Sequence, residues 1–405
     1  MAAALASHGF GHVSVARIAH RGWWIKAEPV GWRKNQLDGI GAAIGVLLNQ
    51  HLNPDDTVTI TLTYMQKETL TARATLECLS RFVLGDNYCD GERTIDLFNG
   101  KNIPDLVEAQ WLVTDQDSSR FHPQLEFKPA FNYVVGNEYG LYDYSVGLSS
   151  GWEMELAQGL LWSGAYLTPL ANSSQYTSRG IWYDSRITNR FASNYLSYTY
   201  EVQPRTWVEV SAGYQNQTDV GSQVEMDWLS ANGRWRLQSL LADYRSDNLP
   251  NTTHTPAYLS GRYSLLPGLW DIDLTGGKFY NGDRGVQAAS NHWFGDYRLQ
   301  FFYRDTGNTA TMPKTQFVGF DVVFPLGPKQ SYQLGPVSLR GGDHTLMDLQ
   351  TTFHQSANTI TTGYGVEPIH DHGLYRDILD FDRAGVDDLW ANIDRVRAAI
   401  KAVQD

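Results

Sequence analysis

The middle of the chain alternates apolar and polar residues, segment after segment. From Tyr142 to Ser149, tyrosine and aliphatic residues occupy every second position, with Asp, Ser and Gly between them. Successive side chains of a β-strand point to opposite faces of a sheet, so this alternation predicts antiparallel strands with one apolar and one polar face. The pattern recurs at 152–162, 196–202, 208–215, 224–228, 259–265, 270–275 and 297–304.

The two ends of the chain have a different pattern. Apolar residues recur at helical spacing from Leu37 to Leu52, and a half-buried Thr-rich strand is expected at 57–64. Near the other end, apolar residues from Leu389 to Val403 form one stripe of an amphipathic helix. These patterns predict an α/β module over 1–120, a β-region over 121–365, and a linker with a terminal helix over 366–405.

The segment from Trp152 to Trp162 favours a membrane barrel over a sandwich or other water-exposed sheet. Read as one strand, its ten steps of ~3.3 Å and a tilt of ~40° project to ~25 Å, the height of a lipid-facing band. Trp152 and Trp162 would then be the aromatic residues at the two membrane interfaces.

The connections between the expected strands point the same way. Tight turns are predicted at 203–205 and 266–268, and long polar loops at 168–180, 244–255 and 281–290. Alternating short and long connections are typical of outer-membrane barrels. The predicted fold class is therefore mainly β: an antiparallel transmembrane β-barrel of about ten to fourteen strands in the outer membrane, with a small N-terminal α/β periplasmic module and a C-terminal amphipathic helix.

Composition narrows the possible partners. Aromatic residues make up 13% of the chain, including 22 Tyr and 13 Trp, which suits membrane interfaces and sugar-stacking surfaces. A net charge of -12 argues against a nucleic-acid partner, because such binding depends on phosphate neutralisation. This composition is compatible with outer-membrane lipids and with polysaccharide as partners.

Two features bear on the compartment. The only cysteines, Cys78 and Cys89, fit either a disulfide in an oxidising compartment or two buried thiols. Residues 1–7 are too short for a signal peptide, so we expect the chain to be a mature form or the C-terminal part of a longer protein.

Charged and aromatic residues on the polar strand face are the candidate functional groups. The carboxylate pairs Glu153/Glu155 and Asp271/Asp273 have residue types found in glycosidases, but they also continue the polar alternation of a lumen wall, which is the preferred interpretation. Aromatic residues on this face could form a sugar-stacking rail or simply fill a narrow barrel. The candidates for polysaccharide contact are Glu153, Glu155, Trp207, Glu209, Tyr258, Arg262, Asp271, Asp273 and Arg298.

No linear motif indicates catalysis. The sequence His370-Asp371-His372 is read as a polar linker, because no third ligand with fixed spacing accompanies it. No phosphate-binding glycine motif is present. These observations predict a protein that is not an enzyme, with no metal and no cofactor.

Several segments resemble the YjbH-type proteins of exopolysaccharide biogenesis. They are Gly261-Arg262-Tyr263, the stretch from Trp270-Asp271 through Gly277-Lys278-Phe279, Gly282-Asp283-Arg284-Gly285, Phe317-Val318-Gly319-Phe320-Asp321-Val322 and Phe324-Pro325-Leu326-Gly327. The likeness is to the C-terminal half of that family, whose members usually carry further barrel strands upstream.

This resemblance implies an outer-membrane component that assists export or assembly of an exopolysaccharide or capsule. It adds export-machinery proteins, or a missing upstream barrel half, to the expected partners. The alternatives are a secreted carbohydrate-active β-protein, either glycosidase or lectin-like, and a nonspecific porin.

Overall fold

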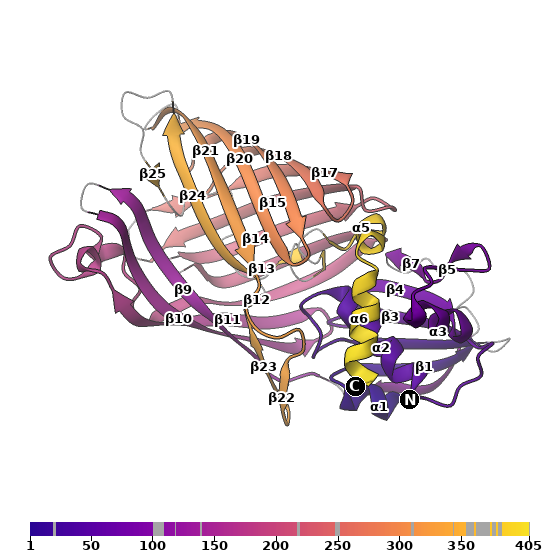
Figure 1. Ribbon diagram of the computed structural model, residues 1–405. Coiled ribbons are helices and arrows are strands. Elements are labelled where there is room, and N and C mark those ends of the chain that lie inside the picture. Colours follow the sequence, from indigo (N-terminus) through magenta and orange to yellow (C-terminus); the bar gives the residue numbers. More distant parts are fainter. Residues whose placement is uncertain are drawn as a thin grey trace.

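The computed structural model consists mostly of β-strands, nearly all of them in two sheets (Figure 1). It describes residues 1–18, 22–99, 109–117, 119–137, 140–216, 219–247, 252–308, 312–342, 344–353, 360–361, 373–374, 378–379 and 383–404. A small mixed sheet with helices lies at the N-terminal end, and a large antiparallel sheet follows. The predicted mainly β fold class is confirmed.

The N-terminal module is a six-stranded sheet with helices packed on it. In sheet order, its strands are β7 (Asp96–Asn99), β4 (Lys67–Thr75), β3 (Thr57–Tyr64), β2 (Gly22–Glu28), β1 (Gly11–Ile18) and β8 (Gln110–Gln116). β2 and β3 pair in parallel, which requires a crossover, and helix α2 (Gln36–Leu48) supplies it. α1 (Ala2–Ser7), α3 (Leu76–Leu84) and the hairpin β5 (Tyr88–Cys89)–β6 (Glu92–Arg93) complete the module.

The predicted helix and the predicted strand at 57–64 are both confirmed, but the expected half-burial of the strand is wrong. Asn35 begins α2, because its Oδ1 accepts a hydrogen bond from the Leu37 amide at 2.9 Å. β3 is buried on both faces. Side chains of neighbouring strands cover the threonines of β3. For example, the Trp24 indole of β2 donates a hydrogen bond to Thr61 Oγ1 at 3.0 Å.

The C-terminal helix packs into the N-terminal module. After the short helix α5 (Val386–Ala391), α6 (Asp394–Gln404) lies along α2, and Val396 and Ile400 belong to the module core. Glycines on α2 allow this close approach: a Cβ at Gly41 would lie 2.5 Å from the Val396 carbonyl oxygen, and one at Gly45 would lie 3.0 Å from that of Ile400.

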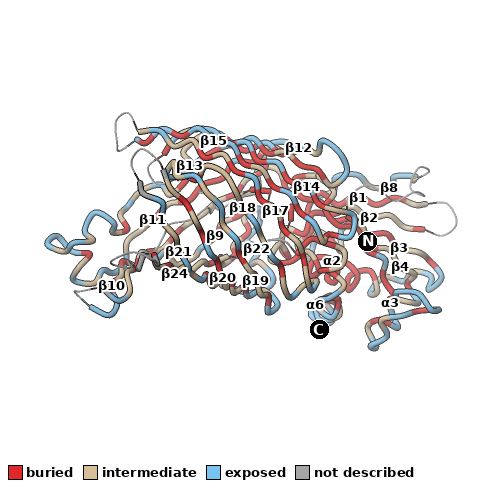
Figure 2. The backbone as a smooth tube through the Cα atoms, turned by 90° about the horizontal axis from the view of Figure 1, so that it is seen from above, coloured by how far each residue is buried: buried red, intermediate tan, exposed pale blue. Residues whose placement is uncertain are grey.

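The large sheet runs antiparallel from strand to strand and curls into a barrel. Its long strands are β9 (Gln124–Asn137), β10 (Gly140–Ala157), β11 (Leu160–Asn172), β12 (Arg190–Gln203), β13 (Thr206–Asn216), β14 (Asp219–Leu229), β15 (Trp235–Ser246), β17 (Ala257–Leu266), β18 (Trp270–Lys278), β19 (Arg284–Phe294), β20 (Tyr297–Asn308), β21 (Met312–Phe324) and β24 (Thr345–Phe353). Short strands accompany them: β16 (Thr253–His254), β22 (Tyr332–Leu334), β23 (Val337–Gly341) and β25 (Ile360–Thr361). Buried and exposed residues alternate along these strands (Figure 2).

The seam of the barrel differs from the rest of the sheet. β23 pairs in parallel with the start of β9, from Ser338 opposite Gln124 to Gly341 opposite Phe127. Further along, the Tyr133 hydroxyl accepts a hydrogen bond from the Asp348 amide at 2.8 Å. Among the described residues, a regular antiparallel ladder between β24 and β9 is absent, so strand β25 and these contacts join the two edges.

Most connections at one end of the barrel are short, but the connection from β21 to β24 there is long, and at the other end short connections join β9 to β10 and β13 to β14. The tight turns predicted at 203–205 and 266–268 are confirmed, and a third separates β10 from β11. At the opposite end, residues 173–189 form a long loop with the 3-10 turns η1 (Ser174–Tyr176) and η2 (Tyr183–Ser185). The loop predicted at 281–290 is wrong from residue 284 onward, because β19 begins there and pairs with both neighbours.

The N-terminal module sits at the short-turn end of the barrel (Figure 1). Lys67 of β4 lies over the Tyr200 ring at 5.8 Å, and Gly233, between β14 and β15, lies against Gly385. The tight turn between β19 and β20 is held by an ion pair between Asp296 and Arg383. This end of the barrel therefore meets folded protein rather than open solvent.

Candidate functional site at the junction of module and barrel

The predicted lumen residues do face the interior of the barrel, but other side chains of the chain surround them. All except Asp273, which is half-buried, are buried: Glu153, Glu155, Trp207, Glu209, Tyr258, Arg262, Asp271 and Arg298. Glu209, for example, accepts a hydrogen bond from the Thr199 hydroxyl at 2.8 Å, and Asp273 accepts one from the Asn291 amide at 2.6 Å. Contact between these residues and a polysaccharide stays a prediction.

Glu153 lies in an ion-pair network that reaches from the barrel wall to the module. Arg33, which follows β2, donates a hydrogen bond to Glu153 Oε2 at 2.9 Å. Arg340 of β23 pairs with Glu153 and lies 3.1 Å from Glu126 Oε2 on β9. These charges are almost fully removed from water, so each depends on its partners for stabilisation.

A second network holds the C-terminal segment in the barrel mouth. The Arg262 guanidinium is completely buried and lies 3.4 Å from Asp271 Oδ2 and 3.6 Å from Asp388 Oδ2 of α5. It also donates a hydrogen bond to the Gly233 carbonyl at 2.8 Å. Asp388 in turn accepts a hydrogen bond from the Gly268 amide at 2.7 Å, so α5 is tied to two of the turns at this end.

An apolar cluster, here called the plug cluster, fills the lumen beside these charges. It combines the tip of the β3–β4 hairpin, inward side chains of the barrel wall and the C-terminal segment; its members are Tyr64, Met65, Leu161, Trp207, Leu229, Leu374, Ile378 and Leu379. Trp207, predicted as a sugar-stacking candidate, is 2% exposed within this cluster. The hairpin tip and Leu374, Ile378 and Leu379 of the C-terminal segment therefore pack against the inner barrel wall near the short-turn end.

A histidine surrounded by carboxylates lies next to the plug cluster. His12 of β1 contacts Asp115 of β8 through Nδ1, and its Nε2 lies 3.0 Å from Glu155 Oε2 on β10. Glu28, at the end of β2, completes the group: one ligand atom from each of His12, Glu28 and Glu155 lies within 4.8 Å of the others. Gln66 of the hairpin tip donates a hydrogen bond to Glu155 Oε1 at 2.9 Å.

Burial and the neighbouring charges shift the pKa values of the two module residues of this group, His12 and Glu28. Burial raises the pKa of Glu28 to about 7, against an opposing effect of Arg33. Burial lowers the pKa of His12, but its hydrogen bonds to Glu155 and Asp115 outweigh this and raise the pKa to about 9. Without another cation, His12 is therefore protonated at neutral pH and donates to both carboxylates.

Sequence reasoning missed this cluster. His12, Glu28, Asp115 and Glu155 are far apart in the chain, and only Glu155 lay on a recognised pattern. A local signal exists in the backbone rather than in the sequence: His12 and Asp115 both adopt positive φ, 50° and 52°, which non-glycine residues rarely do. Such positions are common at functional sites.

The predicted interface pair Trp152 and Trp162 is wrong. The segment is not one strand: β10 ends at Ala157 and β11 begins at Leu160, so the chain reverses at Gly159, where φ is 76°. Met154 lies opposite Trp162 in the resulting hairpin, and the two indole rings lie 5.9 Å apart on the outer surface. They cannot mark opposite membrane interfaces.

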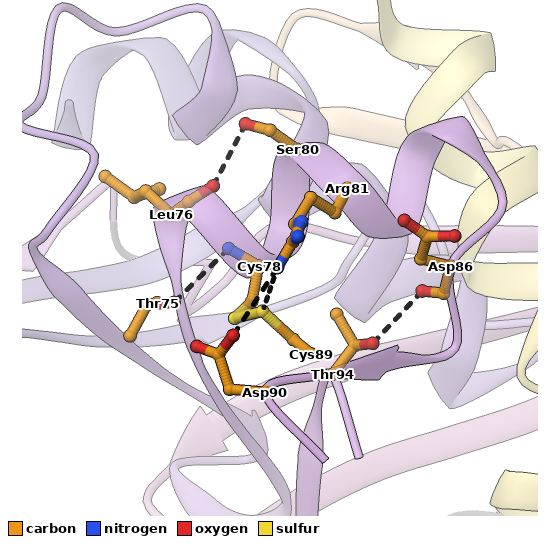
Figure 3. The surroundings of a disulfide bond; sticks show 9 residues. All are labelled: Thr75, Leu76, Cys78, Ser80, Arg81, Asp86, Cys89, Asp90 and Thr94. Atoms are coloured by element: carbon orange, nitrogen blue, oxygen red, sulfur yellow. Dashed lines mark hydrogen bonds and ion pairs between the residues drawn. A yellow bond between two sulfur atoms is a disulfide. The ribbon is translucent and has the colours of Figure 1, made fainter. Parts of the chain in front are cut away.

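The two cysteines form a disulfide in the module, with a Cα–Cα distance of 5.7 Å (Figure 3). Cys78 lies on α3 and Cys89 on the β5 strand, so the bond joins the helix to the small hairpin after it. Arg81 lies beside the bond and 3.6 Å from Asp90. The sequence His370-Asp371-His372 lies outside the described residues.

Comparisons with known proteins give weak likenesses only. No protein-family model and no curated protein matches the chain. The chain is similar to a loop L8 deletion mutant of OmpT, an outer membrane protein of Vibrio cholerae, with 10% identity and a TM-score of 0.32 over 59% of this chain and 97% of that chain. In-vitro folded OmpT gives 9% identity, a TM-score of 0.28, and coverage of 59% of this chain and 87% of that chain.

A third solved structure, an anion-selective porin from Comamonas acidovorans, gives 12% identity and a TM-score of 0.28 over 57% of this chain and 98% of that chain. Similarity at this level assigns neither a family nor a function. In the described part of the chain, no helix is both long and apolar enough to cross a membrane.

The expectation that the chain is not an enzyme is corrected. It rested on the lack of a linear motif, whereas the fold brings His12, Glu28 and Glu155 together in a buried acid–base group. Lack of a motif does not exclude such a site, so the assignment as a non-enzyme is withdrawn.

Proposed function

We propose that the chain is an outer-membrane β-barrel protein that takes part in export or assembly of an exopolysaccharide, with its N-terminal module on the periplasmic side. The observation that carries the membrane part is the reversed polarity of the barrel. Its interior holds buried charges such as Glu225 and Arg262, whereas Leu241, Leu259 and Leu274 on the outer surface are each 60% exposed. A broad apolar outer surface of this kind requires a lipid environment or a partner.

Aromatic side chains on the outer surface support this assignment. Trp228, Trp235, Phe294 and Tyr297 are exposed, and all lie next to connections at the short-turn end. The Trp235 ring lies 4.5 Å from that of Tyr263 on the neighbouring strand. Tryptophan and tyrosine concentrate where lipid meets water, so these residues would form one aromatic girdle.

The long loop at 173–189, at the end of the barrel opposite the module, supports the orientation. Short turns of outer-membrane barrels face the periplasm, and here the module lies at that end. The disulfide between Cys78 and Cys89 suits an oxidising compartment such as the periplasm.

The polysaccharide role rests on the resemblance to YjbH-type proteins and on the aromatic and charged residues at the barrel interior. The plug cluster adds a constraint, because its side chains lie inside the barrel wall near the short-turn end, and we propose that they close the lumen there. Polymer could pass the barrel only after the hairpin tip and the C-terminal segment move, so the structure favours a gated or assembly role over an open nonspecific porin.

Two experiments test the proposal in sequence. Membrane fractionation followed by gel electrophoresis of heated and unheated samples should show a protein that needs detergent and changes mobility on boiling. A protein that stays in the aqueous fraction without a heat shift would refute the membrane assignment. Deletion of the coding sequence should then reduce surface polysaccharide relative to the parent strain, in which the barrel is correctly inserted. An unchanged amount of polysaccharide in the deletion strain would refute the export role alone.

A matched pair of substitutions links the first experiment to the geometry. Leu274→Arg places a charge on the outer surface, where the cost is about 2–4 kcal/mol at the centre of the bilayer. Thr275→Arg changes the next residue, which is buried on the inner face. If the outer surface contacts lipid, transfer to detergent micelles of different thickness should alter the stability loss of Leu274→Arg and leave that of Thr275→Arg unchanged.

A further inference from the structure

The group formed by His12, Glu28 and Glu155 has the composition of a metal site. Its members come from β1, β2 and β10, so two belong to the module and one to the barrel wall. Their ligand atoms lie within 4.8 Å of one another, and all three residues are buried. The separation of 3.0 Å between His12 Nε2 and Glu155 Oε2 is close to the ~3.3 Å expected for two tetrahedral ligands ~2.0 Å from a zinc ion.

Asp115 orients the histidine for this role. It holds Nδ1 of His12, which directs Nε2 toward Glu155 and Glu28. Histidine ligands of metals commonly carry a carboxylate on the second ring nitrogen, which fixes the ring and increases its basicity.

The buried carboxylate of Glu28 also indicates a cation at this position. Its side chain is 2% exposed, and Oε2 has no hydrogen-bond donor among the described residues. A buried carboxylate oxygen without a donor costs free energy, which a bound cation would remove. Two arginines lie near the group: Arg33 hydrogen-bonds Glu153 and lowers the pKa of Glu28, and Arg120 Nε lies 3.9 Å from Glu155 Oε1.

We propose that His12, Glu28 and Glu155 bind a divalent transition-metal ion of the Zn²⁺ class, which fastens the module to the barrel wall. The imidazole ligand favours this class over Mg²⁺ and Ca²⁺, which prefer oxygen ligands throughout. Three protein ligands leave a fourth tetrahedral position for water. Binding replaces the proton on His12 Nε2 with the metal ion.

The test is Zn²⁺ titration of the full chain, purified in detergent without a polyhistidine tag and freed of metal with a chelator. Calorimetry should show one Zn²⁺ per chain and a raised melting temperature on binding. Glu28→Gln keeps the shape of the side chain and should weaken binding at least tenfold, as should His12→Gln. Glu68→Gln, a carboxylate of the same module paired with Lys26, is the matched control and should bind normally.

A second readout protects the test from a folding defect. Glu28→Gln removes a buried charge, so the metal-free variant should melt at or above the temperature of the metal-free wild type, while Zn²⁺ no longer raises it. Substituting alanine for both His370 and His372 controls for zinc binding at that sequence and should change nothing. The proposal is overturned if the wild type binds no stoichiometric Zn²⁺, or if Glu28→Gln and His12→Gln bind it as tightly as wild type.

Discussion

Met65 offers a direct test of whether the module closes the barrel. Its side chain is 1% exposed and belongs to the plug cluster rather than to the module core. Truncation by Met65→Ala should therefore weaken docking of the hairpin tip while leaving the module folded. Replacing a buried methionine by alanine costs 2–5 kcal/mol, and a loss of about 3 kcal/mol would raise the undocked fraction roughly 150-fold.

The backbone of the hairpin tip also indicates that contacts with the barrel hold Met65 in place. Met65 and Gln66 have positive φ, 46° and 63°, as in a type I′ turn, although that turn favours Asn-Gly. Their local conformation is therefore unfavourable, and contacts with the barrel compensate for it: Met65 in the plug cluster and Gln66 on Glu155.

A cysteine at Leu161, on the barrel side of the cluster, can report the opening. Leu161→Cys is made in the wild-type and Met65→Ala backgrounds, and its labelling by a water-soluble maleimide is timed. Labelling through a rare open state follows the population of that state, so the rate should rise roughly 150-fold in the Met65→Ala background. Met65→Leu, which conserves volume, should change the rate little. Equal rates in all three backgrounds would show that the hairpin tip does not close the lumen.

Two further predictions concern the module and its attachment. Replacing Cys78 and Cys89 by serine should lower the free energy of unfolding of the module by about 3 kcal/mol, because the disulfide closes a loop with a sequence separation of 11. The heat-shifted gel mobility of the barrel should stay unchanged. Equal denaturant midpoints for the variant and the wild type would contradict this prediction. Burial raises the pKa of Asp296, but the ion pairs with Arg383 and Arg395 outweigh burial and lower the pKa below its usual value. The Asp296 carboxylate therefore stabilises docking at pH values above the usual aspartate pKa, and this stabilisation is lost as the pH falls through the lowered pKa. Asp296→Asn should flatten this acid dependence of melting temperature, and an unchanged pH profile would contradict the ion pairs.

Strand alternation gave the β-region correctly because it is a local property. In an antiparallel sheet with one polar and one apolar face, each side chain is placed by the parity of its position, so Glu153, Arg262 and Asp271 could be predicted to point inward. The turns at 203–205 and 266–268 also carry local signals, since proline and glycine restrict the backbone. The terminal helix was recognisable from its apolar stripe.

The failed predictions concern reversals without such a signal and contacts between distant segments. The chain from Trp152 to Trp162 alternates apolar and polar residues through the turn at Gly159, so periodicity alone reads a hairpin as one strand. Burial of the inner face was also underestimated, because the sequence does not show that the module enters the barrel mouth. The position of Trp207 on the polar strand face predicts a sugar-stacking residue, but its side chain packs in the plug cluster.

By itself, the sequence determined which face of each strand is polar, where proline- and glycine-containing turns fall, and that the chain ends in an amphipathic helix. Only the tertiary structure decided that α6 packs on α2, that the tip of the β3–β4 hairpin packs against the inner barrel wall, and that His12 meets Glu28 and Glu155. The physical reason is the distance along the sequence over which each feature is determined. Periodicity depends on neighbouring residues and reports which side chains are exposed to solvent. A buried group of charged residues comes from strands far apart in the sequence, and no local pattern shows how those strands pair and dock.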